Sequence, residues 1–286
     1  MLARVAKGFF SQGVAVLFSR VPTIDRVREQ LSMFAPGPPK HDSPIAWPTS
    51  GPSVLLPFRE EVNGFCTVDV VGHEWPDAMG SPKADADVFM AWGVGAFGPY
   101  AYPSGLERAR QQSWAWKAAG EVVSQHRAFA RARISYVFGT PADACVLPED
   151  YAPIDELQFL DAVVAELGAL EGALCVFNPN AELVLSPEMH ASALGAARAE
   201  DVLPMELWIN VRLFRIDDEP GHMLMDTTGM AQLDLPDQEI IFPKTLSCDD
   251  VDSFLRGTCR SPRCCSSRHP PAGYRSAAPR LHEAPA

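Results

Sequence analysis

Residues 126–138, with the sequence HRAFARARISYVF, constrain the fold most strongly because their alternation requires an extended strand. One face of this strand is small and apolar: His126, Ala128, Ala130, Ala132, Ile134, Tyr136 and Phe138. The other face carries Arg127, Arg131 and Arg133 between Phe129, Ser135 and Val137. We expect the apolar face to pack on helices, and the arginine face to meet water or an acid-lined groove.

The remaining patterns alternate between short strands and amphipathic helices. Strands are predicted at 12–18, 53–58, 64–71, 172–178, 205–217, 222–230 and 237–242, with a further possible strand at 88–92. Helices are predicted at 21–34, 103–116, 153–170, 186–201 and from 247, where acidic residues fill the first turn. Asn63-Gly64 predicts a turn between two strands, and the proline-dense residues 35–52 form a connector.

This order predicts an α+β fold with two layers, a mixed and mainly antiparallel sheet, and helices packed on one face. The elements up to residue 138 match a ferredoxin-like split βαβ unit. We expect residues 1–255 to form a single α+β domain that contains the connector 35–52.

The distribution of charge excludes one class of partner for most of the chain. The formal net charge is -12, yet from Arg256 onward six arginines stand against one acid, Glu283, so the preceding residues carry -17. Such an acidic body repels nucleic acids and anionic membranes, whose binding requires lysine and arginine.

The basic start of residues 1–20 is interrupted by polar residues and lacks a cleavage site, so no signal peptide or membrane span is expected. Cys66, Cys145, Cys175 and Cys248 stand singly, as reduced cytoplasmic thiols do.

The last residues, 256–286, differ in composition from the rest. Arginine, proline, alanine, serine and cysteine make up most of this segment, which therefore predicts a disordered tail. Two alternatives are a zinc site using Cys259, Cys264, Cys265 and His269, and a basic arm for nucleic acid. The adjacent cysteines chelate one ion poorly, and the absence of lysine weakens the second alternative. A reading-frame shift near residue 256 would also produce this composition.

The candidate binding residues come from a glycine-rich, aromatic stretch at 92–105 and from the two long strands. The stretch lacks both phosphate-loop patterns, so neither a nucleotide nor another cofactor is predicted, and the acidic groups match no metal-binding spacing. Its aromatics either close the core or line a cleft for a ligand or partner. The candidate residues are Trp92, Tyr100, Tyr102, Trp116, Arg131, Arg133 and Trp208.

Several stretches in order resemble one bacterial group. FFSQGVAVLF, VNGFCTVDVV, FGPYAYPSGLERARQQSWAW, HRAFARARISYVFG and LMDTTGMAQLDLPDQE are similar to the domain-of-unknown-function family 4261 over about residues 8–255. The resemblance implies a bacterial, cytosolic α+β protein and assigns no reaction or catalytic residue. After Leu255 the chain departs from the family, in which the last helix continues with apolar turns.

Two functions are consistent with these observations. The first is a non-catalytic binding or interaction module for an unknown protein or small molecule. It is favoured by the absence of a catalytic motif, by the aromatic loop and by the mixed face of the strand 205–216, which consists of Glu206, Trp208, Asn210, Arg212 and Phe214. The second is an enzyme of unrecognised type, in which His73, Glu74 or His126 acts on an anionic small molecule held by Arg127, Arg131 and Arg133.

Overall fold

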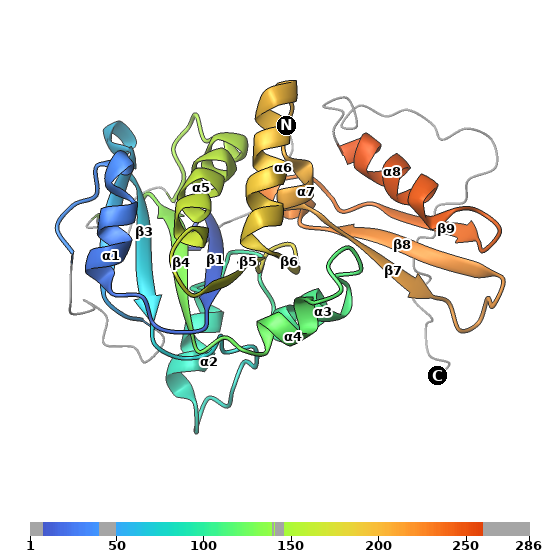
Figure 1. Ribbon diagram of the computed structural model, residues 1–286, viewed down its shortest axis with the longest axis horizontal. Helices are drawn as coiled ribbons and strands as arrows, with labels where there is room; N and C mark the ends of the chain where they lie inside the picture. Colours follow the sequence, from blue (N-terminus) through green and yellow to red (C-terminus); the bar gives the residue numbers. More distant parts are fainter. Residues whose placement is uncertain (1–7, 40–49, 139, 141–145, 260–286) are drawn as a thin grey trace, which may run out of the picture.

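The computed structural model describes residues 8–39, 50–138, 140 and 146–259. Its larger sheet has six strands in the order β2-β3-β4-β1-β5-β6 (Figure 1). Each pair of neighbouring strands in it is antiparallel. The strands are β1 Gln12–Phe18, β2 Ser53–Arg59, β3 Gly64–Val71, β4 Ala128–Ser135, β5 Ala173–Asn178 and β6 Leu183–Leu185. The α+β class and the mainly antiparallel pairing predicted from the sequence are therefore confirmed.

Helices cover both faces of this sheet, which corrects the expectation of one covered face and two layers. On one side lie α1 Ile24–Gln30, α5 Pro153–Gly168 and α6 Pro187–Glu200. On the other lie α2 Ala86–Gly93, α3 Gly105–Gln111 and α4 Ala119–Val123 (Figure 1). Strand β1 is buried along its whole length. Because both of its faces meet helices, its apolar side chains lie on both faces and do not alternate with polar ones.

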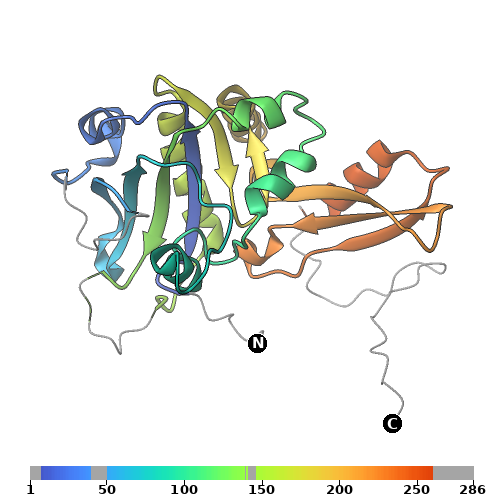
Figure 2. The same ribbon diagram turned by 90° about the horizontal axis from the view of Figure 1, so that it is seen from below.

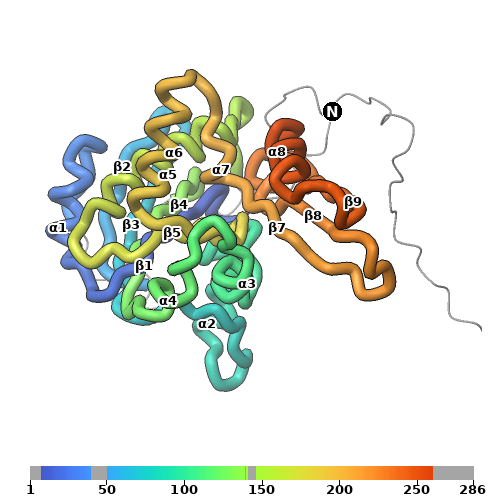
Figure 3. Tube along the Cα trace, turned by 45° about the vertical axis from the view of Figure 1, so that its right-hand side comes forward, coloured from blue at the N-terminus to red at the C-terminus, as the bar shows by residue number. Residues whose placement is uncertain are grey.

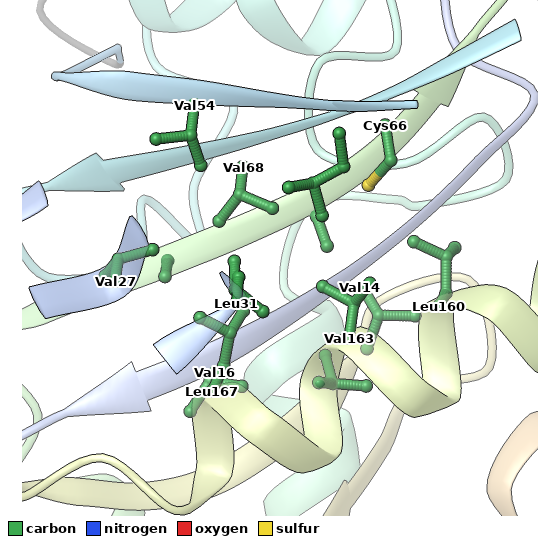
Figure 4. Close-up of a cluster of buried hydrophobic side chains, with 14 of the residues drawn as sticks. Val14, Val16, Val27, Leu31, Val54, Cys66, Val68, Leu160, Val163 and Leu167 are labelled. Atoms are coloured by element: carbon green, nitrogen blue, oxygen red, sulfur yellow. The ribbon is translucent and has the colours of Figure 1, made fainter. Parts of the chain in front are cut away.

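The alternate residues of β1 separate the core into two clusters. Val14 and Val16 point toward Val163 and Leu167 of α5 (Figure 4). Ala15 belongs to the opposite cluster, which contains side chains of α2, α3 and α4. Helix α5 is the amphipathic helix predicted at 153–170, and it begins with a proline at its first turn. Its apolar stripe is the one that the sequence indicated.

Two predicted elements adopt a different secondary structure. Residues 88–92 belong to helix α2, because a short apolar run without alternation does not distinguish a strand from a buried helix. The long strand predicted at 205–217 begins only at Asn210; the residues before it form the short helix α7, Met205–Trp208. The turn predicted at Asn63 is present, with Asn63 in the left-handed conformation at a φ of 59° after the 3-10 turn η2, Glu60–Val62.

A split βαβ arrangement is present, but it lies later in the chain than expected. Strands β4 and β5 both pair antiparallel with β1, so they are parallel to each other with β1 between them. Helix α5 connects β4 to β5. The unit predicted before residue 138 is absent from the described chain because β4 lies between β1 and β3, so β1 and β3 are not neighbours.

A second, three-stranded antiparallel sheet follows the first. It consists of β7 Asn210–Arg215, β8 His222–Thr228 and β9 Glu239–Pro243, in that order. These strands project away from the larger sheet, and α8, Cys248–Cys259, lies along them (Figure 3). Val251 and Leu255 of α8 pack on Val211, Met225 and Phe242, which covers one face of the second sheet.

The boundary of the predicted tail is corrected by α8. Arg256 through Cys259 continue this helix, whereas residues 260–286 lie outside the described residues. The predicted disorder therefore falls on the segment after Cys259, and the reading-frame shift near residue 256 stays a prediction. Of the connector 35–52, residues 40–49 lie outside the described part, and the others form neither helix nor strand. No helix in the described part is long and apolar enough to cross a membrane.

The two buried cysteines give a testable consequence of this packing. Burial raises the pKa of Cys66 and of Cys175 to about 12. Since the thiolate is the reactive form, iodoacetamide at mildly alkaline pH should label exposed Cys248 in the native protein and leave Cys66 and Cys175 unlabelled. Peptide mass spectrometry measures the labelling, and denaturation in guanidinium chloride should expose both buried thiols. Labelling of Cys66 at the rate of Cys248 without denaturant would contradict the packing.

Candidate functional site

The seven residues predicted as binding candidates are not brought into one cleft. Trp92 and Trp208 are buried, Tyr100 and Trp116 are half-buried, and Tyr102 is 68% exposed. Trp92 donates from Nε1 to the carbonyl oxygen of Pro76 at 3.2 Å, and its ring centroid lies 4.6 Å from that of Phe97. The aromatic stretch therefore mainly closes the core on the α2 side of the larger sheet.

Arg131 and Arg133 share one carboxylate, that of Asp69 on the neighbouring strand β3. Arg131 Nη2 lies 2.5 Å from Asp69 Oδ2, and Arg133 Nη2 lies 3.0 Å from Oδ1. Both guanidiniums also donate to the carbonyl oxygen of Ala96, at 3.2 and 3.1 Å. All three charged side chains are at least nine-tenths buried. The arginine face thus meets an internal acid, and these donors hold the sheet and the loop at Ala96 together.

The pKa values in this cluster follow from burial and from charge. Burial alone would raise the pKa of Asp69, but the two guanidiniums outweigh it and hold the pKa below its ordinary value. Burial, with Arg131 nearby, lowers the pKa of Arg133 to about 10. The group of three charges is a structural ion cluster, and its geometry does not favour the hypothesis that Arg131 and Arg133 receive an anionic substrate.

The other groups considered for acid–base chemistry have separate interactions. His126 is buried; its Nε2 accepts from the Trp75 amide at 2.9 Å, and its Nδ1 lies 2.6 Å from the carbonyl oxygen of Val123. These contacts require the neutral tautomer with the proton on Nδ1. Glu74 pairs at the surface with Arg127 at 2.8 Å. Exposed His73 lines a shallow pocket of about 640 Å³ together with Thr23 and Asp25, away from the seven candidates.

Trp208 takes part in a second buried polar group, which the sequence did not reveal. Its Nε1 donates to Asp161 Oδ2 at 2.8 Å, and Asp161 Oδ1 lies 3.3 Å from His190 Nε2. Burial raises the pKa of Asp161 although both neighbours favour its charged form. Trp208 also packs among Leu157, Leu194 and Met230. Its role is to connect α5, α6 and α7, and it presents no surface to a partner.

Tyr100 lies in the aromatic loop, which Asn180 connects to the larger sheet. Its amide donates to Asn180 Oδ1 at 3.0 Å, and Asn180 Nδ2 donates to the carbonyl oxygen of Gly13 at 2.8 Å. Burial and the nearby carboxyl group of Asp234 raise the pKa of the Tyr100 hydroxyl. Asn180 therefore fastens the loop to β1, which explains why the loop does not open into a cleft.

A charged bridge joins the two sheets at the base of the second one. Glu182, after β5, accepts from Arg108 Nε at 2.8 Å and from Arg212 Nη1 at 3.0 Å. Arg212 on β7 also donates from Nε to Asp226 Oδ1 of β8 at 2.9 Å. The Glu182 side chain is only 8% exposed, and its contacts with Arg108 and Arg212 link α3 to the second sheet.

The face of the second sheet opposite α8 presents apolar side chains in a row. In the strand register Phe214 faces Leu224, and Leu224 faces Ile241. Ile241 is 44% exposed, and the Arg212 guanidinium lies 5.4 Å from the ring centroid of Phe214. Trp114, which is 51% exposed, donates to the carbonyl oxygen of Val211 at 3.3 Å at the adjoining edge of β7.

The views in Figures 2 and 3 show the second sheet extending beyond the larger one. We call this surface the open face; it consists of Trp114, Arg212, Phe214, Leu224, Asp226, Glu239 and Ile241.

Sequence reasoning found only part of the open face. The alternation of the predicted strand 205–217 placed Arg212 and Phe214 on one side, as observed. Leu224 and Ile241 were missed, although the alternation in HMLMDTT and the apolar run in EIIF contain them. Asp69, Asp161 and Glu182 carry no local signal, because their partners lie far away in the sequence.

Searches of protein-family models, of curated proteins and of solved structures found no match to this chain. The resemblance to family 4261 therefore stays a prediction. Among residues 8–39, 50–138, 140 and 146–259, no three His, Cys, Asp or Glu side chains lie together as metal ligands would. Of the residues in the zinc alternative, Cys264, Cys265 and His269 lie outside the described residues.

Proposed function

We propose that this protein is a non-catalytic interaction module that binds its partner through the open face of the second sheet. The observation that carries the proposal is the row Phe214–Leu224–Ile241, which α8 leaves uncovered while it buries the opposite face. Antiparallel sheets commonly leave one face to water, but that face then alternates to polar residues. Here it carries three large apolar side chains with a tryptophan beside them.

The surroundings of the row support a protein partner. Aromatic residues and arginine are enriched in interfaces, and Trp114, Phe214 and Arg212 supply them here. Asp226 and Glu239 flank the row on one side, and acidic residues predominate in the whole chain, which argues against nucleic acids and anionic membranes as partners. We place the protein in the cytoplasm because Cys66, Cys175, Cys248 and Cys259 are free thiols.

A photo-crosslinking amino acid at position 214 tests this proposal. When the purified variant is irradiated in a cell lysate, we expect a discrete protein adduct. The same amino acid at Met33, which is 73% exposed on the first half of the chain, is the matched control and should give no such adduct. Equal adducts from both positions, or none from position 214 at any concentration, would contradict binding at the open face.

A further inference from the structure

We propose that the open edge of β9 accepts an extended peptide strand in which an apolar residue precedes a lysine or arginine by two positions. This inference rests on the proposed function and specifies the chemistry of its partner. The added strand would run antiparallel to β9 and extend the second sheet by one strand.

The hydrogen-bond register of β8 and β9 shows which main-chain groups face outward. Thr227 donates its amide to the carbonyl oxygen of Gln238 at 2.8 Å, and Lys244 donates to that of Gly221 at 3.0 Å. Since bonded pairs recur every second residue, Ile240 and Phe242 also bond to β8. The amides and carbonyls of Glu239 and Ile241 therefore point away from β8, and nothing in the described chain bonds to them.

The other edge of the second sheet, β7, and the β2 edge of the larger sheet are covered at several main-chain groups. At β7, the Leu213 amide donates to Gln112 Oε1 at 3.3 Å, and the Val211 carbonyl accepts from Trp114. At β2, the Leu55 carbonyl accepts from the Gly37 amide at 2.9 Å, and Pro57 has no amide proton. Folded proteins block exposed edges in these ways because an open edge pairs with other strands. The β9 edge is the exception among these, and it lies beside the apolar row.

The side chains at this edge specify what the added strand carries. Ile241 and Glu239 point to the same face, two residues apart. A residue opposite Ile241 would extend the row Phe214–Leu224–Ile241 and is therefore apolar. Glu239 is exposed, lies directly opposite Asp226 in the register, and forms no ion pair within the described residues. Asp226 is already paired with Arg212, whereas a lysine or arginine opposite Glu239 would supply the counter-charge that Glu239 lacks among the described residues.

Charge also decides between a foreign strand and a second copy of this chain. Residues 210–259 contain ten Asp and Glu against four Lys and Arg. Two copies paired through β9 would place these acidic regions side by side. The site ends at Pro243, which has no amide proton and whose carbonyl accepts from Leu246 at 3.0 Å. An added strand thus meets four main-chain groups and one carboxylate, which favours a short basic segment of another protein.

The test uses the labelled peptide acetyl-Thr-Thr-Val-Thr-Lys-Thr-Thr-amide and the full chain. Nuclear magnetic resonance titration follows the Glu239 and Ile241 amides. We expect saturable shifts and slower hydrogen exchange at both amides. N-methylation at the valine should weaken binding about tenfold, because it removes a donor to β9, whereas N-methylation at the threonine after it removes an amide that points outward and should change little.

A charge swap provides the second arm of the test. Replacing the peptide's lysine with glutamate should weaken binding about tenfold, and Glu239→Lys in the protein should restore it. Asp218→Lys, in the turn between β7 and β8, is the matched control for the same change of charge and should restore nothing. Equal affinity for both methylated peptides, failure of the swap, or a dimer in sedimentation that Ile241→Pro dissociates would overturn the proposal.

The two proposals fail in distinguishable ways. If position 214 still forms its adduct while the peptide pattern has no effect on binding, the open face binds a partner by another mode and strand addition is wrong. If neither the adduct nor peptide binding is observed, both proposals are wrong.

Discussion

Replacing Asp69 with alanine should lower the free energy of unfolding by about 3–5 kcal/mol, because it leaves the Arg131 and Arg133 guanidiniums buried without their counter-charge. Both arginine side chains are less than one-tenth exposed and cannot turn to water. Denaturant unfolding followed by circular dichroism measures the loss. The triple variant Asp69→Leu, Arg131→Met, Arg133→Met should recover part of the lost free energy of unfolding. No buried charge is then left without a partner.

The matched control for this prediction is Glu74→Ala. Glu74 also pairs with an arginine, Arg127, but the two side chains are 61% and 60% exposed. Solvent screens such a pair, so its removal should change the free energy of unfolding by less than about 1 kcal/mol. If Asp69→Ala and Glu74→Ala cost the same, the Asp69 carboxylate is not the counter-charge of a buried cluster.

The pH dependence gives an independent check on Asp69. Its pKa in the folded protein lies below the ordinary value of 3.8 that applies to the unfolded chain. The stabilising contribution is therefore fully present above that ordinary value and is lost as the pH falls through the lower, folded pKa. The difference in unfolding free energy between the wild type and Asp69→Ala should be constant near neutral pH and shrink only at strongly acidic pH.

The same cluster shows how far the sequence alone could predict this fold. Alternation in 126–138 correctly placed Arg131 and Arg133 on one face of a strand, because side-chain direction follows from the two-residue period. It could not supply Asp69, which precedes Arg131 by 62 positions and becomes its neighbour only through the β3–β4 register. The candidate arginines therefore looked available for a ligand until their internal partner was known.

The errors at α2 and α7 have a related cause. Met205, Leu207 and Ile209 alternate like a strand, yet Met205, Leu207 and Trp208 are all buried around one turn of helix. A short stretch rich in apolar residues satisfies either geometry, so the surrounding packing decides between them. The sequence indicated Arg212 and Phe214 because they lie in a strand with clear alternation. It did not indicate Ile241, because a continuous apolar run does not show which of its residues is exposed.

Replacing Gly229 with alanine should lower the free energy of unfolding by about 2–5 kcal/mol, because a left-handed backbone and a close approach act together. Gly229 has a φ of 113°, which disfavours a side chain. An added Cβ would also lie 2.7 Å from the Ala181 Cβ and even nearer to the carbonyl oxygen of Trp208. Thermal unfolding measures the change as a lower Tm.

Gly195→Ala is the control for the same chemical change. Gly195 is exposed within α6, and nothing lies within 4 Å of the position that its Cβ would occupy. Because alanine is the better helix former, this variant should be more stable than the wild type by up to about 1 kcal/mol. The two glycine substitutions should therefore differ in sign. If Gly229→Ala were also neutral or stabilising, Gly229 and the short 3-10 helix that follows it, η3, Met230–Leu233, would not pack against Trp208 and Ala181 as these contacts require.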